Sequence, residues 1–212
     1  MGRARSLLST IRTRWRLNYI AFEGVEGAGK STVVRMLAER LRDAGHEVVE
    51  IREPGGTRLG DAIRGLLLDG DSPMAPWAEA ALFAAARAQL ATEVIGPAIE
   101  RGAWVLSDRT VYSSLAYQGG GRKLGLEEVR TLNTLALDGT WPDLVVWLDV
   151  DAEVGLTRQE NGDRIGSEGL AFHLAVADTF AELAAAEPGR VIRIDAGTDI
   201  GSVVDAVWEL IR

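Results

Sequence analysis

The chain has no cysteine among its 212 residues. This absence excludes disulfides, thiolate zinc sites and a cysteine nucleophile, and it fits a cytoplasmic location. No apolar run approaches the roughly 18 residues of a membrane span, so a membrane partner is not expected. With 47% hydrophobic and 25% charged residues, the composition is that of an ordinary globular protein.

Positive charge is also scarce. The net charge is −8, and the only lysines are Lys30 and Lys123. Residues 1–17 hold five arginines and no acidic residue; without these five, 18 of the 23 basic residues remain, against 31 acidic ones. Such an acidic body argues against a nucleic-acid partner. Any phosphate that the protein handles must therefore be held by a few local groups.

The basic start sets residues 1–17 apart from the remainder. We interpret it as a flexible extension in front of a single domain, residues 18–212. An arginine-rich, acid-free start also resembles an organellar transit peptide, and its first residues, MGRARS, formally fit a myristoylation pattern. Both alternatives stay open.

Apolar runs and helical periodicities alternate along the chain. Buried strands are predicted at 17–24, 46–52, 103–108, 143–150 and 190–195. Helices are predicted at 30–45, 58–69, 76–102, 110–118, 125–138, 152–160, 168–186 and 199–211, with a kink at Gly96-Pro97 and a glycine turn at 118–122. This order predicts an α/β fold, with a five-stranded parallel sheet covered by helices on both faces. Ligands of such sheets bind beyond the carboxyl ends of the strands.

One glycine-rich stretch follows the first strand. Residues 24–31, GVEGAGKS, match the phosphate-binding pattern G-x-x-x-x-G-K-[ST], between a strand and a helix as that pattern requires. The pattern predicts a three-layer P-loop NTPase fold that binds ATP or another nucleoside triphosphate, with the Lys30 ammonium on the terminal phosphates and the Ser31 hydroxyl on Mg²⁺. No guanine-reading N-K-x-D and no LSGGQ-like stretch is present, which argues against a GTPase and a transporter ATPase. The candidate ATP-binding residues are Gly24, Val25, Glu26, Gly27, Ala28, Gly29, Lys30, Ser31 and Thr32.

Two further groups of residues suit an acceptor site. Asp108 ends the third strand, where a carboxylate can hold Mg²⁺ or position an acceptor, and the Arg109 guanidinium beside it can grip a phosphate bidentately. Phe83 and Arg87 are four residues apart and share a helix face. A ring there can stack on a base while the guanidinium donates to a base carbonyl.

Together, FEGVEGAGKST (22–32), REPGGT (52–57), LFAAAR (82–87) and DRTVYSSLAYQGGGR (108–122) resemble the thymidylate kinase family of P-loop nucleoside monophosphate kinases. The resemblance implies the reaction ATP + dTMP → ADP + dTDP with Mg²⁺, carried out by a homodimer. It implies that Arg52 and Arg109 bind the acceptor phosphate, that Phe83 stacks on thymine, and that Arg87 bonds an exocyclic oxygen of the base. Glu26 would face the acceptor sugar or its Mg²⁺, and Ser114, Tyr117 and Gln118 would line the thymine and deoxyribose pocket.

The resemblance also implies a small lid at about residues 156–169, as in bacterial members with basic residues in the lid. Arg158 and Arg164 are its candidate catalytic arginines. The segment is less basic than expected, since Gln159, Glu160 and Asp163 lie among them. This weaker lid is the only support for one alternative, a weakened nucleotide-binding paralogue that acts through a partner. A kinase for another deoxynucleotide or nucleoside also remains an alternative.

Overall fold

A computed structural model describes residues 17–69, 73–158 and 163–212. The predicted basic extension lies outside the described residues except for Leu17, and so do residues 159–162 of the predicted lid. All five predicted strands form one parallel sheet in the order β2-β3-β1-β4-β5. Their bounds are β1 Tyr19–Glu23, β2 Val48–Arg52, β3 Trp104–Asp108, β4 Leu144–Asp149 and β5 Val191–Asp195.

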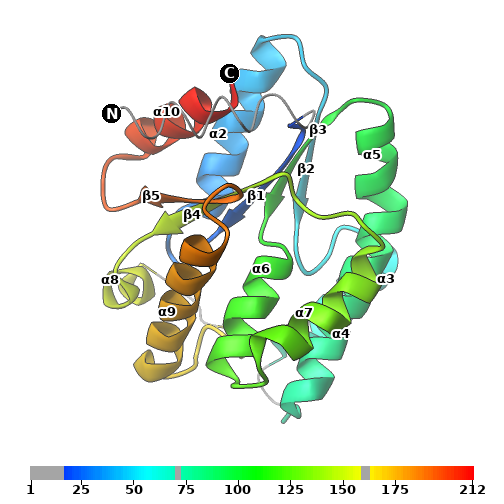
Figure 1. Ribbon diagram of the computed structural model, residues 1–212, viewed down its shortest axis with the longest axis vertical. Coiled ribbons are helices and arrows are strands. Elements are labelled where there is room, and N and C mark those ends of the chain that lie inside the picture. Colours follow the sequence, from blue (N-terminus) through cyan, green and yellow to red (C-terminus); the bar gives the residue numbers. More distant parts are fainter. Residues whose placement is uncertain (1–16, 70–72, 159–162) are drawn as a thin grey trace.

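Helices cover both faces of this sheet, which confirms the predicted three-layer α/β fold. Figure 1 shows α2 and α10 together on one face, and α4, α6, α7 and α9 on the other. The helical bounds are α2 Lys30–Asp43, α3 Arg58–Leu68, α4 Pro76–Leu90, η1 Ala91–Ile95, α5 Gly96–Glu100, α6 Val111–Ser114, η2 Leu115–Gly121, α7 Leu126–Leu137, α8 Ala152–Thr157, α9 Leu170–Ala186 and α10 Ile200–Ile211. Within the described ranges, none of these helices has the length and apolarity that a bilayer crossing requires.

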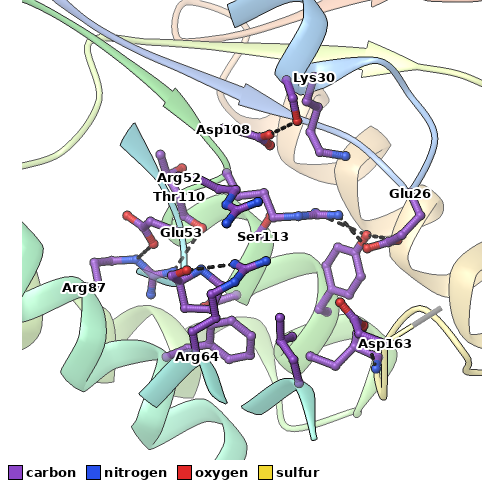
Figure 2. A pocket seen from close by; sticks show the side chains of 18 of the residues that line it. Glu26, Lys30, Arg52, Glu53, Arg64, Arg87, Asp108, Thr110, Ser113 and Asp163 are labelled. Atoms are coloured by element: carbon purple, nitrogen blue, oxygen red, sulfur yellow. Dashed lines mark hydrogen bonds and ion pairs between the residues drawn. The ribbon is translucent and has the colours of Figure 1, made fainter. Parts of the chain in front are cut away.

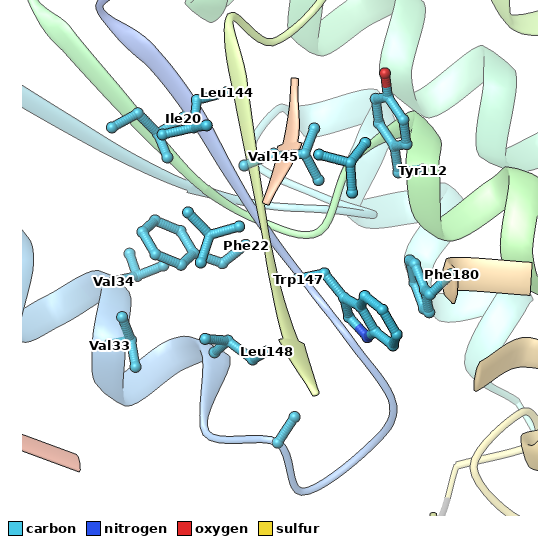
Figure 3. Close-up of a cluster of buried hydrophobic side chains, with 14 of the residues drawn as sticks. Ile20, Phe22, Val33, Val34, Tyr112, Leu144, Val145, Trp147, Leu148 and Phe180 are labelled. Atoms are coloured by element: carbon cyan, nitrogen blue, oxygen red, sulfur yellow. The ribbon is translucent and has the colours of Figure 1, made fainter. Parts of the chain in front are cut away.

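The central strands are buried on both faces, because alternate side chains enter two different cores. In Figure 3, Phe22 of β1 and Leu148 of β4 lie on the side of α2, near Val33. Trp147 of β4 points the other way and stacks on Phe180 of α9, with ring centroids 6.2 Å apart. Packing in these two cores holds the sheet in place relative to the helices that line the pocket.

The long helix predicted at 76–102 is continuous, but its middle turn is wound as a π-helix. This turn, η1, ends at Ile95, two residues before Pro97, which has no N–H to donate to the preceding turn. Local π winding accommodates such a missing hydrogen bond without ending the helix. The predicted kink at Gly96-Pro97 is therefore a change of winding.

The prediction of a glycine turn at 118–122 is wrong, because residues 118–121 are helical. Gly119, Gly120 and Gly121 continue the helix that begins at α6, as the π-helix η2. The glycines are needed for packing: a Cβ on Gly120 would lie 2.0 Å from Thr179 Oγ1, and one on Gly121 would lie 2.5 Å from the Phe172 ring. Their small size lets η2 contact α9 closely, which a turn-based interpretation of the glycines could not foresee.

Candidate active site

A pocket opens at the carboxyl ends of β1, β2 and β3, at the edge where the parallel-sheet rule places ligands. Figure 2 shows side chains from the phosphate loop, the ends of β2 and β3, and the helices α3 and α4 around it. Twelve of the predicted site residues line it: Glu26, Gly27, Lys30, Ser31, Arg52, Phe83, Arg87, Asp108, Arg109, Ser114, Tyr117 and Gln118.

The phosphate loop has the backbone that its glycines allow. Gly24 and Gly27 have φ angles of 141° and 71°, and a Cβ on Gly27 would lie 2.2 Å from the Gly155 carbonyl oxygen. No side chain caps the N-terminus of α2, so its first N–H groups remain open to an anion. The other predicted ATP-binding residues, Gly24, Val25, Ala28, Gly29 and Thr32, are outside the pocket lining.

Lys30 is buried and folded back onto this loop. Its Nζ donates to the carbonyl oxygens of Gly24 at 3.1 Å and Val25 at 2.7 Å. Burial and the nearby Arg109 guanidinium lower the pKa of Lys30 to about 8. The ammonium is thus poorly compensated, and a phosphate anion beside it would favour the charged form.

Glu26, the acidic residue of the loop, is held by Arg109 and Tyr117, two residues predicted to bind the acceptor. Its carboxylate pairs with Arg109 Nη2 at 2.5 Å and accepts from Tyr117 Oη at 2.6 Å. Arg109 itself has a left-handed φ of 72°, and its N–H donates to the Phe22 carbonyl oxygen at 3.0 Å. The strained backbone aims the guanidinium back across the pocket toward Glu26.

Glu23 is a positioning residue that the sequence analysis missed. Its buried carboxylate, at the end of β1, accepts from the Thr110 N–H at 2.7 Å and from Ser113 Oγ at 2.6 Å. Burial raises the pKa of Glu23. These bonds tie the segment after Asp108 to the phosphate loop. The sequence does contain a clue to this role, since Glu23 is a charged residue at the end of an otherwise apolar strand.

The predicted base-binding pair lies together on α4. Phe83 and Arg87 both line the pocket, and Arg87 is only 1% exposed. Its Nε donates to Glu53 Oε2 at 2.6 Å, its Nη2 donates to the Thr110 carbonyl oxygen at 3.1 Å, and its Nη1 donates to Asn133. The guanidinium is therefore fixed in place before any ligand arrives.

Two guanidinium groups approach the pocket from β2 and α3. Arg52, at the end of β2, makes no side-chain hydrogen bond or ion pair with the described residues. Arg64 of α3 also lines the pocket and donates to the Pro54 carbonyl oxygen at 2.8 Å (Figure 2). Burial and Arg52 lower the pKa of Arg64. The sequence analysis missed Arg64, although its helix directly follows the REPGGT loop.

The predicted magnesium ligands are adjacent. The Ser31 hydroxyl donates to the Asp108 carboxylate, and both residues line the pocket beside Lys30. Among the described residues, no three His, Cys, Asp or Glu side chains form a metal cluster. One hydroxyl and one carboxylate nevertheless suit Mg²⁺, which takes few protein ligands and keeps water and phosphate oxygens. These residues fit the ion that the sequence predicts.

The two candidate lid arginines lie in different places. Arg158, after α8, donates from Nη1 to the Gly27 carbonyl oxygen at 3.4 Å and so borders the phosphate loop. Arg164 lies outside the pocket lining: its Nη2 pairs with Glu79 of α4 at 2.7 Å, and its Nε donates to the Leu67 carbonyl oxygen. A role for Arg164 in catalysis would require it to leave Glu79.

Comparison with known proteins agrees with this geometry. A family model described as "Thymidylate kinase" matches residues 22–207. The chain is 50% identical over 194 residues to a thymidylate kinase of Synechococcus sp. (strain JA-3-3Ab), covering 92% of this chain and 95% of the relative. It is 45% identical over 198 residues to one of Desulforudis audaxviator, covering 92% and 90%. A crystal structure of thymidylate kinase from Ehrlichia chaffeensis superposes with a TM-score of 0.78 at 30% identity, covering 92% of this chain and 98% of that one.

Proposed function

The chain belongs to the thymidylate kinase family, so its reaction is ATP + dTMP → ADP + dTDP, and we propose how its pocket carries out this transfer. The observation that carries the proposal is the meeting of two cations at one carbonyl oxygen. Lys30 of the donor loop and Arg109 of the acceptor segment both donate to the Gly24 carbonyl oxygen, at 3.1 and 3.2 Å. A phosphoryl group moving between ATP and dTMP at this point would be within reach of both.

On the donor side, ATP would place its phosphates against the open N-terminus of α2 and the Lys30 ammonium. This arrangement offsets the charge that builds up on the equatorial oxygens during transfer. The protein supplies no nucleophile, because the acceptor phosphate itself attacks. Catalysis then consists of aligning two anions and screening their repulsion.

On the acceptor side, Arg52 and Arg109 would bind the dTMP phosphate, with Arg64 adding charge nearby. Phe83 would stack on the thymine ring, and Arg87 would donate to its exocyclic oxygen. The Ser114 hydroxyl is buried and has no hydrogen-bond partner, so it is available to the nucleotide. Tyr117, held by Glu26, would pack against the sugar and exclude a ribose hydroxyl.

Ser31 and Asp108 would hold Mg²⁺ in this scheme. The ion supplies charge that neutralises the phosphates of ATP. Arg158 is the proposed lid arginine, since it already borders the phosphate loop. We extend the proposal to a homodimer, as the family resemblance implies, and to a cytoplasmic location, which the absence of cysteine fits.

The test of function is ADP release with a panel of acceptors: dTMP, dUMP, dCMP and thymidine, with and without Mg²⁺. We expect turnover with dTMP and a preference for it over the other acceptors, and none without Mg²⁺. A larger rate with another acceptor would reassign the substrate. Calorimetric binding of dTMP with no turnover would instead favour the regulatory paralogue.

The pKa of Lys30 predicts a pH dependence. Only the ammonium form attracts ATP, and in the free enzyme its pKa is lowered to about 8. The kcat/KM for ATP should therefore be level below pH 8 and fall as pH rises through that value. Bound triphosphate favours the charged form, so kcat at saturating ATP should decline only at higher pH. Initial rates at low and saturating ATP would measure both curves; coincident curves would contradict the assignment.

A further inference from the structure

Glu79, on the first turns of α4, is a buried carboxylate that the scheme above does not use. It is 0% exposed and accepts hydrogen bonds from Gln118 Nε2 at 2.9 Å, from Arg122 at 3.2 Å, and from Arg164, whose Nη2 lies 2.7 Å away. Burial alone would raise its pKa, but the bonds from Arg122, Gln118 and Arg164 outweigh burial and lower the pKa of Glu79. The group is therefore a charged, acceptor-only carboxylate.

An acceptor-only neighbour determines which end of the Gln118 amide faces it. Only the NH₂ group can donate to Glu79, so the amide nitrogen must point toward α4 and the amide oxygen away from it. Gln118 lines the pocket, and no described residue donates to its Oε1. Gln118 consequently offers the pocket a hydrogen-bond acceptor.

Arg87 offers the same pocket hydrogen-bond donors instead of an acceptor. A guanidinium only donates, and this one is held by Glu53, Asn133 and Thr110 while it lines the pocket. An acceptor and a donor in the lining of one pocket match a pyrimidine with an N–H at position 3 and a carbonyl at position 4. Cytosine has both features reversed, with an acceptor nitrogen at position 3 and an amino group at position 4.

We infer that Glu79 is a positioning residue that fixes the Gln118 amide and thereby makes the pocket select thymine over cytosine. This inference rests on the proposed function, because it assumes that the base lies between Phe83, Arg87 and Gln118. Glu79 also pairs with Arg122, just after η2, and with Arg164 of the predicted lid, so losing its charge affects these two segments as well. Because that general effect should be the same for both substrates, only the ratio of kcat/KM for dTMP to kcat/KM for dCMP reports base selection.

The experiment compares kcat/KM for dTMP and dCMP in the full-length enzyme and in Glu79→Gln. A glutamine at this position can donate or accept, so it permits either orientation of Gln118. The preference for dTMP should fall by about tenfold, the factor that corresponds to about 1.4 kcal/mol for one hydrogen bond. Glu168→Gln is the matched control: it removes the other carboxylate partner of Arg122 without touching Gln118, and it should keep the wild-type ratio.

A double-mutant cycle measures whether Glu79 acts on base selection through Gln118. Gln118→Met removes the amide and should lower the dTMP preference by itself; adding Glu79→Gln to it should then change the ratio no further. An unchanged ratio in Gln118→Met, or equal losses for both substrates in Glu79→Gln, would overturn the inference. If Glu79→Gln does not fold, Glu79→Asp replaces it: the shorter side chain keeps the charge but draws the carboxylate back from the Gln118 amide, so the dTMP preference should again fall, and an unchanged ratio would overturn the inference. A wild-type enzyme without dTMP kinase activity would instead defeat the proposed function, so the two failures are distinguishable.

Discussion

Replacing Lys30 by methionine is expected to lower kcat by about 10³-fold and to leave the fold intact. The ammonium is the cation of the phosphate loop, and it donates to the same carbonyl oxygen as Arg109, the proposed acceptor-binding arginine. Methionine keeps the buried aliphatic stem but not the charge. Because the lysine is buried and its pKa is already lowered to about 8, removing its charge also removes a desolvation cost. Steady-state rates and thermal unfolding would measure both effects.

The chain offers a matched control in its other lysine. Lys123 is exposed and lies outside the pocket lining, so Lys123→Met should keep the wild-type rate. A Lys30→Met enzyme with an unchanged rate would remove the phosphate loop from the mechanism. A large drop in melting temperature would instead mean that the two carbonyl contacts of Lys30 hold the loop together.

Replacing Arg109 by alanine is expected to cost both activity and stability. In the proposed scheme the guanidinium contacts both the acceptor phosphate and the transferring phosphoryl, so kcat/KM for dTMP should fall by about 10³-fold. Its loss also leaves the Glu26 carboxylate without its cation in a site where both side chains are less than one-fifth exposed. We expect a destabilisation of about 2 kcal/mol, the range for a hydrogen bond to a charged group. The replacement should not change the backbone strain at φ 72°, because alanine and arginine both carry a Cβ.

A double variant separates the two effects. Arg109→Ala with Glu26→Gln removes the unpaired charge while keeping an acceptor for Tyr117, so most of the lost stability should return in urea unfolding. Activity should stay low, since no guanidinium is restored. Recovery of turnover in the double variant would mean that Arg109 acts only by neutralising Glu26, and that another cation binds the acceptor phosphate.

The Glu26 carboxylate illustrates how far the sequence could predict the site. Its place in an anion-binding loop is visible in GVEGAGKS, and the family resemblance directs it to the acceptor. Its partners are not visible, because Arg109 and Tyr117 are 83 and 91 residues away along the chain. The lid arginines show the same limit: both were predicted from one short segment, yet one borders Gly27 and the other pairs with Glu79.

The five strands, the order of elements and the phosphate loop could all be predicted from the amino-acid sequence. Each of these depends on the spacing of apolar residues or on a motif within a few consecutive positions, where the backbone itself brings the residues together. The π-helical course of η2, and the partners of the buried charges Glu23, Glu53 and Glu79, depend instead on how distant segments pack together. Gln118 bonds to Glu79 across 39 residues because η2 packs beside α4. Such contacts depend on how neighbouring elements are placed, and a buried carboxylate accepts whichever donors that packing brings within reach.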